Sequence, residues 1–317
     1  MRGERAFSLT ELMIVMLLSM ILLSIKLTTF VSLNRSSRQT QQLAELQQSA
    51  QFMLSLMRNE LQNMAFWGGQ NDIALAKSVD NPLPPAPDCV NADIDSGSFP
   101  QAATNFVYVY ARLVSSGRQL NCIPSAAVGS ELLQLKRLIG HVQTVDTLRD
   151  NRFYLESDWQ HSRFVSADSA DLQPQMQYFP YQHLVLYVQM QRLDGQNIPV
   201  LMRKRLVRTA AGVANISTDS IIDGVERLHF EFGVDSNLDG TPDFQLTTAE
   251  ISDDIWQQQT ARIVSLKYYV LLRARAQDTE YINDQTYTMG KQLFKADGDH
   301  YRRLLVSSTV FFNNAVL

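Results

Sequence analysis

Oxygen-bearing side chains alternate over nine residues in the C-terminal half of the chain. The pattern D-x-N-x-D-G-x-x-D is formed by Asp235, Asn237, Asp239, Gly240 and Asp243. Alternate carboxylate and amide oxygens around a turn that glycine permits are the ligands a hard cation such as calcium needs. The main-chain oxygen of Thr241 would be a further ligand. Position 246, where an EF-hand has a bidentate Glu, is Leu, which cannot ligate, and a dockerin- or thrombospondin-like loop completed by waters stays open. A polar hairpin turn built on Asp-Gly is the other interpretation.

A second candidate is one acidic side chain at the edge of a long apolar run. Glu11 directly precedes the run from Leu12 to Leu33. A carboxylate in such a position costs about 2.5–3.5 kcal/mol on insertion scales, so it is a functional candidate by default. Its natural partner is a positive charge on the same helix or on a neighbouring one.

The apolar run has the length of a membrane span. At about 1.5 Å per residue, Leu12 to Leu33 gives roughly 30 Å of helix, one hydrocarbon core. Lys26 lies inside it, and its long stem can snorkel to an interface. The basic leader, with Arg2 and Arg5, should stay in the cytoplasm while the C-terminal part crosses the membrane. An uncleaved signal anchor is the alternative interpretation.

The N-terminus resembles the class III signal of type IV prepilins, through the residues RAFSLTELMIVMLLSMILL. The resemblance implies that a prepilin peptidase cuts between Ala6 and Phe7 and methylates the new N-terminus at Phe7. Glu11 is then the acidic fifth residue of the mature chain, which forms a salt bridge with a subunit's N-terminal amine during assembly. The family usually has Gly before the cut, where this sequence has Ala6.

The helical pattern continues beyond the apolar run. Apolar residues recur at three- and four-residue steps between polar ones: Leu43, Leu46, Ala50, Met53, Met57, Leu61 and Met64. No Pro or Gly occurs from Phe7 to Trp67, and Gly68–Gly69 is a stop signal. We therefore predict a leader over residues 1–6 and one helix over 7–68. Residues 7–33 would form its membrane and filament-core half, and residues 34–68 its amphipathic half.

Residues 69–317 should form a β-rich periplasmic domain. The runs rich in Val, Tyr, Phe and Leu predict strands: Phe106–Val114, Glu131–Leu138, Arg152–Glu156, His183–Gln191, Pro199–Val207, Val225–Val234, Ile263–Arg273 and Tyr301–Phe312. The fourth and fifth runs should form a hairpin with Asp194–Gly195 in its turn. The fold class is α+β: a long N-terminal helix, transmembrane in its first half, packed on antiparallel sheet.

The two cysteines lack the spacing of a metal site. Cys89 and Cys122 could be one disulfide or two unrelated buried thiols. In a periplasmic domain we expect the disulfide, joining the Pro-rich segment around Cys89 to the sheet.

Composition and motifs exclude several other functions. The chain is 45% hydrophobic with a net charge of −4, and no basic stripe would follow a phosphate backbone, so no nucleic-acid partner is expected. Arg203, Lys204, Arg205 and Arg208 form a basic run that suits a solvated strand face. No GxSxG, P-loop or GxGxxG occurs. We expect no catalytic residues and no enzyme activity, and calcium is the one candidate cofactor.

Both ends of the chain resemble PilW-type minor pilins. The segments that carry the likeness are NELQNMAFWGG, VERLHFEFGVDSNLDGTPD, ARIVSLKYYVLLRARAQ and DGDHYRRLLVSSTVFFNN. The resemblance implies a minor pilin that primes or supports type IV pilus assembly near the tip. Its implied partners are other minor pilins, the major pilin, the prepilin peptidase, the inner-membrane assembly platform and membrane lipid. It would be a single-pass protein of the bacterial inner membrane, later incorporated into the pilus.

Two other functions remain open at this stage. A GspJ-like pseudopilin of type II secretion would have a similar anchor and a similar β-rich domain. A membrane-anchored periplasmic hydrolase or binding module would need a pocket of convergent polar groups, and it leaves the FSLTE anchor unexplained.

Overall fold

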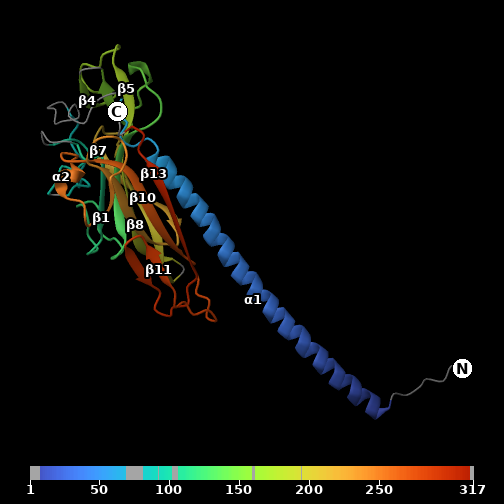
Figure 1. Cartoon of the computed structure of the whole chain (residues 1–317). Coiled ribbons are helices and arrows are strands. Elements are labelled where there is room, and N and C mark those ends of the chain that lie inside the picture. The colour runs from blue at the N-terminus through green and yellow to red at the C-terminus, as the bar shows by residue number, and fades with distance from the viewer. Residues whose placement is uncertain are drawn as a thin grey trace.

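One long helix projects from a β-rich body in the computed structural model of the chain (Figure 1). The structure describes residues 8–68, 81–91, 93–101, 106–158, 161–193 and 195–314. The helix ends against one side of the body, and its N-terminal half extends well beyond it. This is the predicted α+β class.

Helix α1 spans Leu9–Leu61. Its N-cap is Ser8, whose backbone N–H donates to Oε2 of Glu11 at 3.0 Å. The helix ends seven residues before Gly68, earlier than predicted. Ala65 adopts a left-handed conformation (φ 63°), and the chain bends so that the side chains of Met64 and Trp67 enter the core. Burial of these side chains, and not the glycine pair, therefore ends the helix.

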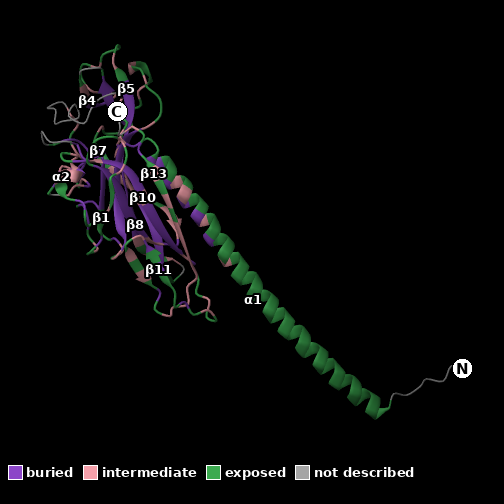
Figure 2. Ribbon diagram, in the orientation of Figure 1, coloured by how far each residue is buried: buried purple, intermediate pink, exposed green. Residues whose placement is uncertain are grey.

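The first half of α1 is exposed throughout, and burial begins at Leu46 (Figure 2). From there, one face of the helix packs on the body. The predicted stripe is buried from Leu46 to Met64, whereas Leu43 remains 43% exposed. The helix contacts strands β10 and β13.

A seven-stranded antiparallel sheet forms the larger layer. Its strands are β1 Val109–Leu113, β2 Glu131–Leu138, β3 Phe153–Ser157, β4 Ser162–Ser166, β5 Gln177–Leu193, β6 Gln196–Arg208 and β7 Ala214–Asp223. The order is β1-β2-β5-β3-β4, and β6 pairs with both β5 and β7. Tyr181 pairs with both β2 and β3, and Leu184 pairs with both β2 and β6. Strands β3 and β6 therefore follow one another along the same edge of the long strand β5.

A four-stranded antiparallel sheet lies between this layer and the helix, in the order β13-β10-β8-β9. Its strands are β8 Val225–Asp235, β9 Phe244–Thr247, β10 Arg262–Arg273 and β13 Arg303–Phe311. Alternate residues of β10, such as Leu266, Tyr268 and Val270, join the central core with the helix stripe. On its other face, Tyr269 and Leu271 pack under the hairpin of β11 (Thr286–Met289) and β12 (Gln292–Lys295). Two short helices, η2 (Val145–Thr147) and α2 (Asp253–Trp256), are the remaining elements among the described residues.

Every predicted strand is present. The predicted hairpin is β5–β6, with Leu193 paired to Gln196 and Gly195 at φ +77°; Asp194 lies outside the described residues. Strands β4, β7, β9, β11 and β12 were not predicted. The long strand β7 (ANISTDSIID) is half-exposed and polar at most positions, so it lacks the apolar alternation of a strand with one buried face.

Candidate assembly site on the helix and its junction with the sheets

The exposed half of α1 is the largest uncovered apolar surface among the described residues. Leu9 is 78% exposed and Met20 is 75% exposed, and their neighbours are similar. By length and composition this helix can cross a membrane. Apolar surface on this scale must be covered by lipid or by other helices, because leaving it in water costs roughly 25 cal/mol per Å².

Glu11 lies at the free end of this half. Its carboxylate caps the backbone N–H of Ser8 and remains exposed. A carboxylate in the first helical turn interacts favourably with the positive end of the helix dipole. The predicted cleavage and methylation residues, Ala6 and Phe7, lie outside the described residues, so their roles stay predictions.

The end of the helix is bonded to the seven-stranded sheet. Arg137 of β2 donates from Nη2 to Oε2 of Glu60 at 2.5 Å and from Nη1 to the carbonyl of Asn59 at 2.7 Å. Both charged side chains are 9% exposed. This ion pair joins the last helical turn of α1 to the seven-stranded sheet.

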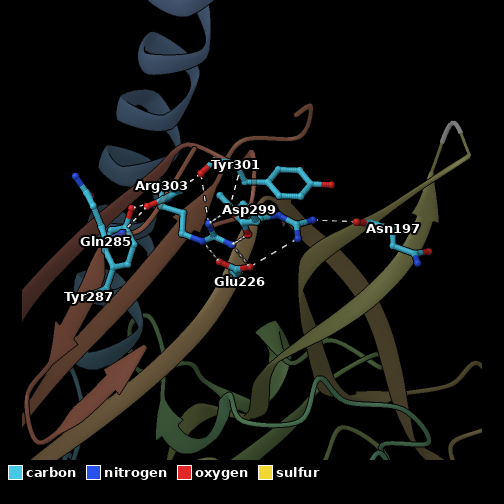
Figure 3. Close-up of polar contacts among 9 residues, drawn as sticks. Asn197, Glu226, Gln285, Tyr287, Asp299, Tyr301 and Arg303 are labelled. Carbon is cyan, nitrogen blue, oxygen red and sulfur yellow. Dashed lines mark hydrogen bonds and ion pairs between the residues drawn. The ribbon is translucent and has the colours of Figure 1, made fainter. Parts of the chain in front are cut away.

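A second ion-pair network crosses the four-stranded sheet near the start of β13 (Figure 3). Arg303 donates to both carboxylate oxygens of Glu226, at 2.6 and 3.0 Å, and to both oxygens of Asp299, at 2.7 and 2.5 Å. The side chain of Arg303 is 2% exposed. Arg273 packs over the ring of Tyr301 and donates to the carbonyl of Asn197. Strands β6, β8, β10 and β13 are thereby tied together.

The same region reaches the helix through the β10–β11 connection, residues 274–285. Arg302 donates to Asp278 at 2.8 Å, and this hydrogen bond holds the pKa of Asp278 below its usual value. Glu280 forms an ion pair with Arg35 of α1, with 2.6 Å between Oε2 and Nε. The connection thus touches the helix just after its apolar run.

These arginines lie in the segments that resemble PilW-type minor pilins, but the sequence predicted no role for them. The signal that could have found them is an Arg within an apolar strand: a buried guanidinium requires a carboxylate partner. Glu226 follows Val225 at the start of β8 and is such a partner.

Two polar clusters lie in the interior. Ser98 donates to Asp88 at 2.6 Å and lies 2.9 Å from Nδ1 of His183, whose Nε2 lies 2.8 Å from Nε2 of Gln134. Ser98 and His183 are at most 1% exposed, and Asp88 contacts Ser98 and not the imidazole. This is therefore not the geometry of a nucleophilic triad.

In the second cluster, Glu131 of β2 accepts from Phe230 N and Thr248 Oγ1 and lies 2.8 Å from Nδ1 of His229. It joins the two sheets in the core.

The predicted disulfide is present between Cys89 and Cys122. Cys122 lies in the connection between β1 and β2 and not on a strand, so the bond joins two loops. Gln134 of β2 donates to the carbonyl of Cys89 at 2.7 Å and ties the loops to the sheet.

The candidate calcium ligands lie together in the β8–β9 loop. Asp235 accepts from the backbone N–H groups of Leu238 and Gly240, at 2.6 and 2.8 Å. Asp239 accepts from Thr241, and this hydrogen bond lowers the pKa of Asp239.

Asp243 closes the loop, accepting from the backbone and hydroxyl of Ser236, while Asn237 donates to Asp239 and Asp243. Within the described part of the chain, no group of three or more His, Cys, Asp or Glu side chains is arranged to hold a metal. Calcium binding stays a prediction.

The basic run lies on β6 and meets acidic or polar partners. Arg203 pairs with Asp219, Lys204 donates to Thr218, and Arg208 pairs with Asp168. Much of its charge is thus compensated by neighbouring elements.

Comparison with known families agrees with this arrangement. The family described as type IV pilus-assembly protein W (PilW) matches residues 186–314, which include β8, β10, β13 and the Arg303 network. The prokaryotic N-terminal methylation motif matches residues 1–25. No curated protein and no solved structure shows a significant match to the chain. The chain is thus PilW-like over residues 186–314 and has the N-terminal methylation motif of prepilins, followed by a helix that is long and apolar enough to anchor it in a membrane.

Proposed function

We propose that this chain is a minor pilin, a structural subunit that primes or supports assembly of a type IV pilus near its tip. Two observations together support the proposal. The first half of α1 is apolar and fully exposed, and the PilW family matches the sheet on which the second half of α1 packs. Such a subunit has one covered and one uncovered half of the same helix. The uncovered half exchanges lipid for the helices of neighbouring subunits.

Glu11 has a specific role in this proposal. When the apolar half leaves lipid for a filament core, an unpaired carboxylate would cost several kcal/mol. Pairing with the N-terminal amine of a neighbouring subunit offsets that cost. The proposed partners are therefore other minor pilins and the major pilin, reached after processing by the prepilin peptidase and delivery to the inner-membrane assembly platform. In the proposed topology, the β-rich body lies in the periplasm.

The test replaces Glu11 in the chromosomal gene. A Glu11→Ala strain should still process the prepilin, because the cleavage residues are unchanged, but should contain fewer pili and little of this subunit in sheared pilus fractions. The matched control is Glu45→Ala, an exposed carboxylate of the same helix that accepts a hydrogen bond from Gln41. Normal pilus number and normal incorporation in the Glu11→Ala strain would contradict the proposal.

A GspJ-like pseudopilin of a type II secretion system is the second candidate, because its anchor and sheet would look alike. Deletion of the gene separates the two. Loss of pili with unchanged export of secreted proteins supports the minor pilin, and the reverse supports the pseudopilin.

A further inference from the structure

The β10–β11 connection lies against α1 at the point where the apolar run ends. Besides the Arg35–Glu280 ion pair, Gln42 Nε2 donates to the carbonyl of Ala276 at 3.4 Å. A cleft of about 240 Å³ separates the two segments, lined by helix residues from Val31 to Gln42 and by residues 277–280. Strand β11, which follows this connection, lies at the end of the body that faces along the exposed half of the helix (Figure 1).

This connection presents an apolar side chain from a fixed backbone. Ile282 is 62% exposed, although both of its flanks are anchored. On one side, Glu280 pairs with the helix. On the other side, Asn283 is fully buried, donates to Tyr287 and to the carbonyl of Tyr301, and pairs with the backbone of Asp299. These two anchors hold the side chain of Ile282 in its exposed position, on the loop that contacts α1 just after the apolar run.

Two guanidinium groups of α1 line the cleft opposite this loop, at the expected height of the lipid headgroups. Arg35 follows Leu33 by two residues, roughly 3 Å along the helix axis, and Arg38 is one turn further. Arg38 is exposed, and no described residue forms an ion pair or hydrogen bond with its side chain. Arginine binds phosphate through two parallel N–H donors.

We propose that Ile282, Arg35 and Arg38 form a lipid-contacting rim of the body. Ile282 enters the interfacial layer of the leaflet on the side of the body, and the two arginines bind phospholipid phosphates. Lipid is the occupant because the rim is continuous with the apolar helix run, which is surrounded by lipid before any subunit joins a filament. The inference concerns the subunit stored in the membrane. It rests on membrane anchoring and not on the role of a minor pilin.

The test measures the depth of position 282 in the full-length chain. An Ile282→Cys variant carrying an NBD fluorophore is placed in nanodiscs of phosphatidylethanolamine and phosphatidylglycerol, with no other pilin present. Cys89 and Cys122 are disulfide-bonded and buried, so they do not take the label. The matched control is Val213→Cys, 61% exposed, which lines a cavity with residues of β3 and β4 at the opposite end of the body.

A blue-shifted emission at position 282, quenched by headgroup spin-labelled lipid and absent at position 213, is the expected result. Arg38→Glu should reduce that quenching at least twofold, whereas Arg149→Glu, an exposed charge that follows η2, should not. Equal, solvent-like emission at both positions would overturn lipid contact. Quenching that is insensitive to Arg38→Glu would overturn phosphate binding by Arg38.

Discussion

Arg137 on β2 and Glu60 in the last turn of α1 form a buried ion pair, with Nη2 and Oε2 2.5 Å apart. The same guanidinium donates to the carbonyl of Asn59, one of the carbonyls that a helix end leaves without an internal partner. A cation at this end also interacts favourably with the helix dipole. The direction in which α1 leaves the body is therefore fixed by a polar bond to one sheet and by apolar packing on the other.

Removing one member of this pair should destabilise the body strongly. Glu60→Ala leaves Arg137 charged and buried, a change that typically costs about 3–5 kcal/mol. Urea unfolding of a chain that begins at Gln39 measures this, because the fragment keeps every buried helix residue.

Two variants control the experiment. Glu45→Ala, an exposed carboxylate of the same helix, should change stability by about 0.5 kcal/mol or less. Glu60→Met/Arg137→Met should recover a large part of the loss, because no charge is then left unpaired. A Glu60→Ala unfolding curve that overlays that of Glu45→Ala would show that the pair contributes little.

Local patterns in the sequence predict the elements well, and long-range pairing poorly. The apolar stripe of α1 and the alternation in β10 each reflect which residues are buried within a few positions of one another along the chain. Both elements could therefore be predicted from the sequence. One of the two carboxylate partners of Arg303 is Glu226, 77 positions away. Only the antiparallel register of β8, β10 and β13 brings the two together, and no local pattern encodes that register. The polar strand β7 escaped prediction because only Ala214 of its ten residues is buried, so its sequence lacks apolar alternation.

Burial also gives a prediction about pH. Lys136 of β2 is fully buried, donates from Nζ to the carbonyl of Val107 at 2.6 Å, and lies over the ring of Phe106. Burial lowers its pKa to about 7, although Asp95 and Asp88 oppose the shift. An unfolded lysine has a pKa of about 10.4. Between these values the unfolded chain binds more protons than the folded chain, so the contribution of Lys136 to stability rises with pH.

The measurement compares wild type with Lys136→Met across pH. Below about pH 7 both states of the wild type carry the charge, and the cost of burying it is fully present. From pH 7 to 10 the wild type should gain on the variant by about 1.4 kcal/mol per pH unit. Both proteins are unfolded in urea at each pH, and the flat difference expected at pH 5–6 serves as the internal control. A difference that stays constant up to pH 10 would contradict a low pKa for Lys136.

Processing gives a prediction at the N-terminus. The methylation motif predicts a mature chain that begins with N-methylated Phe7. Mass spectrometry of the subunit from membranes and from sheared pili checks this. Ala6→Gly should be processed at least as well, since glycine is usual at that position of the motif, whereas a bulky charged residue there should block cleavage. Recovery of the pilus-associated protein with Met1 retained would contradict the prediction.

The Asp-rich loop provides the last prediction, since hydrogen bonds to its own carboxylates hold its turn. Gly240 has φ +88°, a conformation that favours glycine, and its N–H donates to Asp235 across the turn. Asp239 and Asp243 are turned toward backbone and hydroxyl donors on the exposed side of the loop. A calcium ion would have to compete with these hydrogen bonds, and it would gain three carboxylates within nine residues.

If calcium binds here, it should stabilise the folded state by RT ln(1 + [Ca²⁺]/Kd), or about 2.7 kcal/mol at one hundred times Kd. Melting the fragment that begins at Gln39 in calcium and in chelator measures the shift. Magnesium should raise the melting temperature less, because it requires a tighter octahedron and loses water reluctantly. The shift should disappear in Asp235→Ala/Asp239→Ala and persist in Asp219→Ala, a carboxylate on β7 outside the loop. A ligand that binds only the folded state must raise the stability of that state. Identical melting curves in millimolar calcium and in chelator would therefore contradict calcium binding, and the role of these residues would be to form the hydrogen-bonded turn.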